Sequence, residues 1–146
     1  MESLPFLDCV YKRHCIRAFL NEPINRSSVE SILLAAGQAA SSKNSQPWFV
    51  CGVDGKRLAA LSALLCKKFD AENYDDEEYT YMMDPIPSIF MQRARECGYG
   101  LFRLKGIDRK DYPARKEHHK MNYRFFNAPL SLFFFLPKEY SLFNKI

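Results

Sequence analysis

Two positively charged side chains near the N-terminus, Arg13 and Arg17, are four residues apart, with His14 and Cys15 between them. Guanidinium groups match phosphate oxygens in a bidentate manner, and each charge-assisted hydrogen bond contributes roughly 1.5–3 kcal/mol. If the segment is helical, both arginines lie on one side of the helix and could bind a phosphate group. The alternative is a solvated helix end, where cations interact favourably with the helix dipole. Spacing alone favours this alternative.

A second group of polar residues lies in the stretch AASSKNSQPWFV, residues 39–50, which leads directly into an apolar segment. Ser41, Ser42 and Asn44 carry short side chains that hydrogen-bond well and bury little area. The simplest alternative is a helix-to-strand connection, which is rich in Ser and Asn because these residues bond their own backbone. Together with the arginine pair, however, the stretch could hold a phosphorylated ligand that carries a planar polar ring.

These residues must be positioned by an α+β scaffold in which helices dominate and at least two buried apolar strands are present. Apolar periodicity predicts helices over residues 4–15, after the turn at Pro23, through 58–69, and near 88–104 and 113–126. Ser27 and Glu30 have capping-box spacing at the start of the second helix. WFVCGV (48–53) and APLSLFFFLP (128–137) predict strands, the latter covered on both faces because it is almost continuously apolar. The acidic, tyrosine-rich stretch 70–88 is predicted to be a solvated excursion.

The composition excludes several other classes of protein. The 146 residues fit one domain, and 47% apolar with 26% charged residues is ordinary for a globular protein. The longest apolar run, LFFFL at 132–136, is far shorter than a membrane span, so no membrane association is expected. No signal peptide is visible, and five cysteines without a CxxC pair favour reduced thiols, which predicts a cytoplasmic protein.

Neither a nucleic acid nor a metal ion is an expected partner. The net charge of +4 suits an anionic ligand but falls short of the concentrated basic face of a nucleic-acid binder. An RNA-binding interpretation, based on Lys and Arg among aromatic residues at 109–126, ranks last. His118 and His119 are adjacent and therefore do not share a helix face, and no further residue has metal-ligand spacing to them.

In combination, the motifs resemble those of the FMN-dependent nitroreductase family. The family has an N-terminal Arg-Arg/His-Ser-x-Arg/Lys-x-Phe motif, an acidic-Pro pair, a Ser-Ser/Gly-x-Asn-x-Gln-Pro-Trp loop and a Phe-Phe-x-Ala-Pro element. Residues 13–19, 22–23, 41–48 and 122–136 of this chain match these four motifs in the same order. The tyrosine-rich, proline-closed excursion at 70–88, together with the stretch 93–111 after it, is similar to the nitrobenzoate-reductase-like branch. The resemblance runs over residues 7–136 and implies a fold in which helices pack around a central mixed β-sheet.

The resemblance also implies a set of flavin-contacting residues: Arg13, His14, Cys15, Arg17, Ser41, Ser42, Asn44 and Asn122. The arginines would contact the FMN phosphate and the ribityl or pyrimidine side of the flavin, and the two residues between them would lie along the ribityl-phosphate tail. The serines would approach the isoalloxazine ring largely through backbone groups. Asn44 would bond the polar edge of the ring, with Asn122 a weaker candidate there. Residues 46–48 would fix the loop to the strand.

An FMN-dependent oxidoreductase is the implied function, using NAD(P)H to reduce nitroaromatic, quinone or related small-molecule acceptors by a ping-pong mechanism. FMN carries the hydride chemistry, and NAD(P)H is a transient donor that stacks on the flavin and then leaves. Gly98 and Gly100 lie outside any strand-turn-helix dinucleotide fingerprint, and such a cycle requires none. The resemblance further implies a homodimer with the flavin site at the interface, and it assigns no separate catalytic side chain.

The sequence departs from the family pattern in three places. Cys15 stands where serine is usual, and a lost hydroxyl donor would cost about 0.5–1.5 kcal/mol. Ala40 replaces the proline that begins the loop. Only PKEYSLFNKI follows the second strand, so residues 1–146 are expected to form a single nitroreductase-like domain that is incomplete at its C-terminal end and lacks roughly the last third of a typical member. The alternative function is a truncated, catalytically inactive remnant that folds or acts only with a partner.

Overall fold

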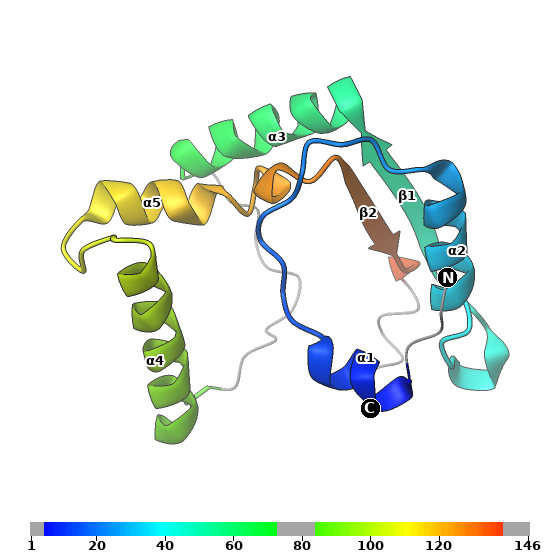
Figure 1. Ribbon diagram of the computed structural model, residues 1–146, viewed down its shortest axis with the longest axis horizontal. Coiled ribbons are helices and arrows are strands. Elements are labelled where there is room, and N and C mark those ends of the chain that lie inside the picture. The colour runs from blue at the N-terminus through cyan, green and yellow to red at the C-terminus, as the bar shows by residue number, and fades with distance from the viewer. Residues whose placement is uncertain (1–4, 73–83, 139–146) are drawn as a thin grey trace. The chain divides into compact units, whose positions relative to one another are not determined.

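Five helices and two strands make up the computed structural model of the chain, which describes residues 5–72 and 84–138 (Figure 1). In chain order they are α1 (Phe6–Lys12), α2 (Arg26–Ala36), β1 (Phe49–Asp54), α3 (Gly55–Asp70), α4 (Ser88–Leu104), α5 (Tyr112–Lys120) and β2 (Leu130–Phe135). One compact unit combines Met1–Asp54 with Phe126–Ile146, and the other is Gly55–Phe125. The predicted α+β class is confirmed. Residues 73–83, which form most of the predicted acidic excursion, lie outside the described residues.

Helix α1 ends earlier than the sequence predicts. Its last residue is Lys12, and Arg13 already has extended backbone angles, with φ −65° and ψ 121°. His14 has modest helix propensity and Ile16 is β-branched, so little in the local sequence favours continuing the helix. The prediction of a helix to residue 15 was wrong, and Arg13 and Arg17 therefore do not share a helical face.

Helix α2 is capped by Asn25 rather than by Ser27. The Asn25 Oδ1 accepts hydrogen bonds from the backbone N–H and from the hydroxyl of Ser27, both at 3.0 Å. Glu30 instead accepts a hydrogen bond of 2.8 Å from Arg26 Nε, one turn away. The predicted capping box was wrong because asparagine is as good a cap as serine and stands two residues earlier.

Strands β1 and β2 form a two-stranded antiparallel sheet within the first unit (Figure 1). The register pairs Phe49 with Phe135 at one end and Asp54 with Leu130 at the other. Within residues 5–72 and 84–138 the sheet is purely antiparallel, which differs from the mixed arrangement that was predicted. The two strands are far apart in sequence, so the pairing holds together the two segments of the first unit.

Neither strand is covered on both faces, contrary to the prediction for the apolar run of β2. The side chains of Phe49 and Phe134 are 66% and 57% exposed. Gly52 of β1 is exposed as well, although a Cβ atom there would lie 3.5 Å from Leu132 Cδ2 and 3.7 Å from Leu130 Cδ1. The first four residues of β2 are half-buried, while Phe134 and Phe135 at its end are exposed.

The second unit has its buried side chains on α3 and α4. Leu58 of α3 is 7% exposed and Phe102 of α4 is 9% exposed. His118 and His119 of α5 approach the Phe102 ring edge-on, with centroid distances of 5.5 and 6.0 Å. The guanidinium carbon of Arg115 lies 5.1 Å from the centroid of the same ring. Helix α5 therefore packs onto α4 through one phenylalanine.

Helix α5 begins as its sequence suggests but ends six residues before the predicted boundary at 126. Its N-cap is Asp111, whose Oδ1 accepts a hydrogen bond of 3.0 Å from the Ala114 N–H. The last helical residue is Lys120. Phe125 and Phe126 have φ values of 51° and 52°, which lie in the left-handed region. A right-handed helix cannot include such residues.

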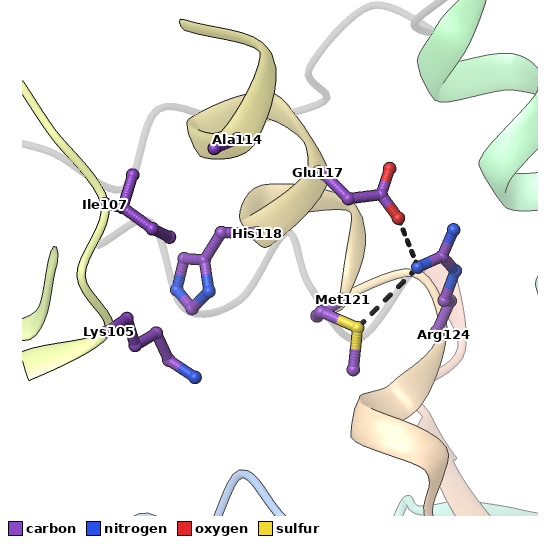
Figure 2. A pocket seen from close by; sticks show the side chains of 7 residues that line it. All are labelled: Lys105, Ile107, Ala114, Glu117, His118, Met121 and Arg124. Atoms are coloured by element: carbon purple, nitrogen blue, oxygen red, sulfur yellow. Dashed lines mark hydrogen bonds and ion pairs between the residues drawn. The ribbon is translucent and has the colours of Figure 1, made fainter. Parts of the chain in front are cut away.

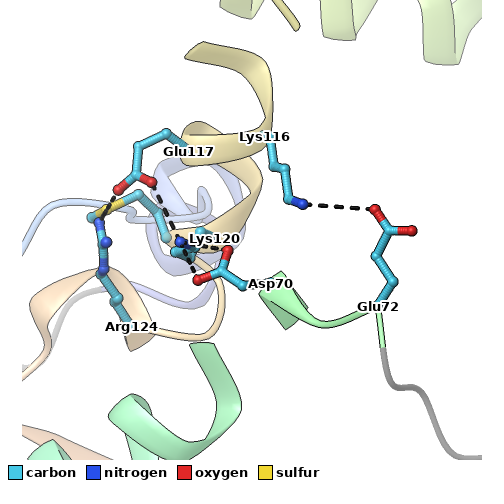
Figure 3. A network of polar contacts seen from close by, with 7 residues as sticks. Asp70, Glu72, Lys116, Glu117, Lys120 and Arg124 are labelled. Atoms are coloured by element: carbon cyan, nitrogen blue, oxygen red, sulfur yellow. Dashed lines mark hydrogen bonds and ion pairs between the residues drawn. The ribbon is translucent and has the colours of Figure 1, made fainter. Parts of the chain in front are cut away.

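An ion-pair network joins the C-terminal ends of α3 and α5 (Figure 3). Lys120 Nζ lies 2.6 Å from Asp70 Oδ1 and 3.7 Å from Glu117, which also accepts a 2.5 Å hydrogen bond from Arg124. The hydrogen bond to Asp70 raises the pKa of Lys120 above its ordinary value. The hydrogen bond to Glu117 likewise raises the pKa of Arg124. Each carboxylate partner therefore favours the charged form of its cation.

Candidate functional site

The first polar segment contains Arg13, His14 and Cys15, all of them exposed. Arg13 Nη1 lies 3.9 Å from Cys15 Sγ. Sulfur is a weak acceptor, so this contact leaves the guanidinium with donors for a stronger anion. His14 Nδ1 lies 2.7 Å from the carbonyl oxygen of Lys12, and because a carbonyl can only accept, this nitrogen carries the proton. The imidazole is thus oriented by the end of α1.

Arg17 makes a long-range contact in the first unit. Its guanidinium carbon lies 5.8 Å from the ring centroid of Phe126, which is within the range of a cation–π interaction. Arg17 is exposed and Phe126 is half-buried. The segment that carries Arg17 therefore reaches the turn that precedes β2. The Phe-Phe-x-Ala-Pro motif contains this ring, but nothing in the motif indicates a contact with an arginine.

The second polar segment is a tight loop that includes a 3-10 turn at Ser42–Asn44. The Asn44 N–H donates to the Ser41 carbonyl (3.0 Å), and the Gln46 N–H donates to the Ser41 hydroxyl (3.0 Å). Gln46 Nε2 also donates to Asn44 Oδ1 at 2.9 Å. Because the Asn44 oxygen is occupied in this way, its Nδ2 amide is the group left to donate to a ligand. Gln46 thus makes its contacts within the loop, and its predicted role in fixing the loop to the strand stays a prediction.

This loop contains backbone strain. Lys43, Asn44 and Gln46 have φ values of 53°, 55° and 44°. The left-handed conformation costs an L-residue roughly 1–2 kcal/mol, and only asparagine among these three tolerates it well. Strained backbone of this kind is found where function requires a particular conformation. The strain was not predictable from the sequence, because neither lysine nor glutamine signals a positive φ.

Asn122 belongs to the second unit, whereas the other predicted site residues belong to the first. Its Nδ2 donates a hydrogen bond of 2.8 Å to the carbonyl of His119 at the end of α5. This contact gives Asn122 a role in ending the helix. Its predicted role at the flavin edge stays a prediction.

A surface pocket of about 380 Å³ lies in the second unit, between the end of α4 and α5 (Figure 2). Its lining consists of Lys105, Ile107, Ala114, Glu117, His118, Met121 and Arg124. The Arg124 guanidinium is directed to the Glu117 carboxylate and to the Met121 sulfur, at 2.5 and 3.8 Å. Its charge is therefore compensated within the pocket, and the pocket contains none of the predicted site residues.

Two other kinds of site are not found in the described ranges. No group of three or more His, Cys, Asp or Glu side chains within 5–72 and 84–138 is arranged to hold a metal ion. No helix in the same ranges has both the length and the apolar character needed to cross a bilayer.

The donor set of the first unit fits a phosphorylated heterocycle. Exposed guanidinium groups at Arg13 and Arg17 suit phosphate oxygens, which accept bidentate hydrogen bonds. The amide of Asn44 suits a ring carbonyl or ring nitrogen, because it is oriented as a donor. A flavin mononucleotide has both features, so the residues that are present match this cofactor.

Comparison with known proteins identifies relatives over most of the chain. Residues 10–144 match the sequence profile described as the Nitroreductase family. A 4-nitrobenzoate reductase from Pseudomonas putida is 32% identical over 135 residues, which cover 90% of this chain and 59% of the relative. A nitrobenzene nitroreductase from Ectopseudomonas oleovorans is 29% identical over 141 residues, covering 95% of this chain and 62% of the relative. The chain thus spans about three-fifths of the length of these curated relatives.

Solved structures of nitroreductases are similar to this chain in fold. The FMN and NADPH-dependent nitroreductase NfnB from Sphigopyxis sp. strain HMH matches with a TM-score of 0.82 and 26% identity, covering 97% of this chain and 66% of that protein. The FMN-dependent nitroreductase NfnB from Mycobacterium smegmatis, in complex with NADPH, matches with a TM-score of 0.79 and 25% identity. The match covers 90% of this chain and 59% of that protein. The predicted nitroreductase-like fold is confirmed. The chain belongs to the nitroreductase family.

Proposed function

We propose that the chain is an FMN-dependent oxidoreductase that uses NAD(P)H to reduce nitroaromatic, quinone or related small-molecule acceptors. The observation that carries the proposal is the donor set of the first unit, in which exposed guanidinium groups at 13–17 accompany a strained, donor-rich loop at 41–46. The FMN and NADPH dependence stated for the solved relative from Sphigopyxis supports it. Bound FMN would supply hydride transfer in a ping-pong cycle.

In this proposal the N-terminal segment holds the phosphate end of FMN. Arg13 would donate to the phosphate oxygens, in place of its weak contact with Cys15. Arg17 would contact the phosphate or the ribityl and pyrimidine side. His14 would lie along the ribityl-phosphate tail, with its ring oriented by the carbonyl of Lys12.

The loop at 41–46 would hold the isoalloxazine ring. Asn44 would donate from Nδ2 to the polar edge of the ring, because its oxygen is bound by Gln46. Ser41 and Ser42 would approach the ring largely through backbone groups, while the Ser41 hydroxyl accepts a hydrogen bond from the Gln46 N–H within the loop. Asn122 would be a further contact near the same edge. Donors at this edge favour the reduced, more negative ring.

We also propose that the chain forms a single cytoplasmic nitroreductase-like domain that assembles as a homodimer with the flavin site at the interface. The open aromatic side chains of Phe49, Phe134 and Phe135 support association, because exposed apolar patches mark contact surfaces. Five free cysteines agree with a reducing compartment. Light scattering coupled to size-exclusion chromatography should give twice the chain mass of 17.0 kDa. A monomer that binds FMN would contradict the interface site.

The experiment that tests the function compares FMN with riboflavin, which lacks the phosphate. Flavin fluorescence quenching should show that Arg13→Ala lowers FMN affinity by about ten- to a hundredfold, corresponding to one charge-assisted hydrogen bond. Riboflavin affinity should hardly change. The matched control is Arg26→Ala, which removes an exposed arginine whose partner is Glu30 and should alter neither affinity. The proposal would be refuted if the wild-type protein does not bind FMN and does not reduce an acceptor with NAD(P)H.

A further inference from the structure

The Arg17–Phe126 contact brings together two residues from opposite ends of the described chain. Arg17 lies in an exposed segment outside any helix, where a long side chain has many rotamers. At a centroid distance of 5.8 Å the aromatic face attracts the guanidinium and restricts where it lies. A ring at this place therefore reduces the entropy that Arg17 would lose on binding an anion.

The ring itself is held by an unusual turn. Phe125, Phe126 and Asn127 have φ values of 51°, 52° and 60°, three left-handed residues in succession. Such conformations are costly for phenylalanine and persist only where the surroundings impose them. The turn leads directly into β2, whose first residue, Leu130, is in register with Asp54 of β1. The backbone of Phe126 is thus tied to the sheet by a short, strained connection.

A stacked arginine can still donate hydrogen bonds, as the second unit illustrates. Arg115 lies over the Phe102 ring, and its Nη1 donates a hydrogen bond of 3.1 Å to the carbonyl of Arg109. The π-face contact uses the plane of the guanidinium, while the N–H groups project from its edge. Arg17, whose guanidinium carbon lies 5.8 Å from the Phe126 centroid, can in the same way contact the ring and still donate to an acceptor.

We propose that Phe126 is a positioning residue that holds the Arg17 guanidinium with its N–H edge presented to the phosphate group of FMN. The proposal rests on the proposed function, because the phosphate is that of the proposed cofactor. Phe126 acts through Arg17 and does not itself contact the phosphate. Its removal therefore changes FMN binding only while Arg17 is present.

The test compares Phe126→Leu, which keeps an apolar side chain, with Phe126→Tyr, which keeps the aromatic face. In fluorescence titrations Phe126→Leu should weaken FMN binding about two- to fivefold, the effect of one exposed cation–π contact, and leave riboflavin binding unchanged. Phe126→Tyr should bind FMN as the wild type does. Adding Phe126→Leu to Arg17→Ala should cause no further loss. Phe90→Leu is the control, since it makes the same change at an exposed ring of α4 that has no part in the proposed site.

A readout without flavin separates this proposal from the proposed function. The Arg17 Nε–Hε signal in a ¹⁵N spectrum should show a ring-current shift that disappears in Phe126→Leu, and inorganic phosphate should perturb it at lower concentration in the wild type than in that variant. Equal phosphate response in the two proteins, or FMN binding by Phe126→Leu equal to that of Phe90→Leu, would overturn the positioning role. Wild-type protein that binds no FMN would refute the proposed function, while the phosphate response would still decide the role of Phe126.

Discussion

Replacing Lys43 by glycine should stabilise the chain, although it removes a whole side chain. Lys43 has φ 53° and ψ 25°, in the left-handed region, within the loop proposed to hold the flavin ring. An L-residue pays for this conformation through the clash of its Cβ with the backbone, and glycine has no Cβ. The stability of the loop is therefore limited by its backbone geometry at this position.

The magnitude follows from two opposing contributions. Relief of the left-handed conformation contributes roughly 1–2 kcal/mol to the free energy of unfolding. The greater freedom of glycine in the unfolded chain subtracts roughly 0.5–1 kcal/mol. The net stabilisation of Lys43→Gly is about 0.5–1 kcal/mol. For a chain of this size 1 kcal/mol raises Tm by roughly 2–4 °C.

Urea unfolding followed by circular dichroism measures the effect. The matched control is Ser45→Gly, because Ser45 is in the same loop but has a right-handed φ of −71°. There glycine relieves nothing and should destabilise by about 0.5–1 kcal/mol. The two variants should thus move the urea midpoint in opposite directions. If Lys43→Gly unfolds at the same or a lower urea concentration than the wild type, the assignment of strain to this loop is wrong.

Three further results are expected. Phe102→Ala should lower the free energy of unfolding, measured in urea, by about 3–5 kcal/mol. Phe90→Ala changes a residue of the same helix that is 47% exposed, and it should lower the free energy of unfolding by less than half as much. Equal losses would contradict the packing described for α4. The hydrogen bond to Asp70 raises the pKa of Lys120 in the folded protein. This ion pair therefore contributes fully to stability below the ordinary pKa of 10.5, and the contribution is lost as the pH rises through the raised pKa of the folded state. In urea titrations the wild type should therefore have a higher free energy of unfolding than Lys120→Met at neutral pH, and the difference should shrink only above about pH 10.5. No difference near neutral pH would contradict the ion pair. Cys15→Ser should bind FMN up to about tenfold more tightly in fluorescence titrations, because a hydroxyl donates to phosphate better than a thiol, and weaker binding would exclude contact with the phosphate.

The parts of the fold that could be predicted are those in which local pattern and packing agree. Leucines at helical spacing predicted the helix that contains Leu58, and this residue is buried. The helix ends could not be predicted as well, because they depend on single competing residues. Asn25 takes the cap in place of Ser27, and α1 stops before Arg13 because nothing in the following sequence favours a further turn.

The candidate site was predictable as a set of residue types and not as a geometry. Motif order placed Arg17 and Asn44 among the flavin contacts, and these assignments stay predictions. The sequence could not indicate that Arg17 lies over Phe126, since a contact between residues so far apart depends on tertiary structure. The left-handed backbone conformation of Lys43 could not be predicted either, because glycine and asparagine, and not lysine, indicate such a conformation in a sequence.

The antiparallel pairing of β1 with β2 has a consequence for biosynthesis. Strand β1 leaves the ribosome early, but its partner emerges only after the whole of Gly55–Phe125 has been translated. During that interval the open aromatic edge of β1 has no hydrogen-bonding partner from its own sheet, and nascent apolar strands of this kind are prone to aggregate. Recombinant expression at reduced temperature or with additional chaperone should therefore increase the soluble yield by acting on the nascent chain, independently of FMN.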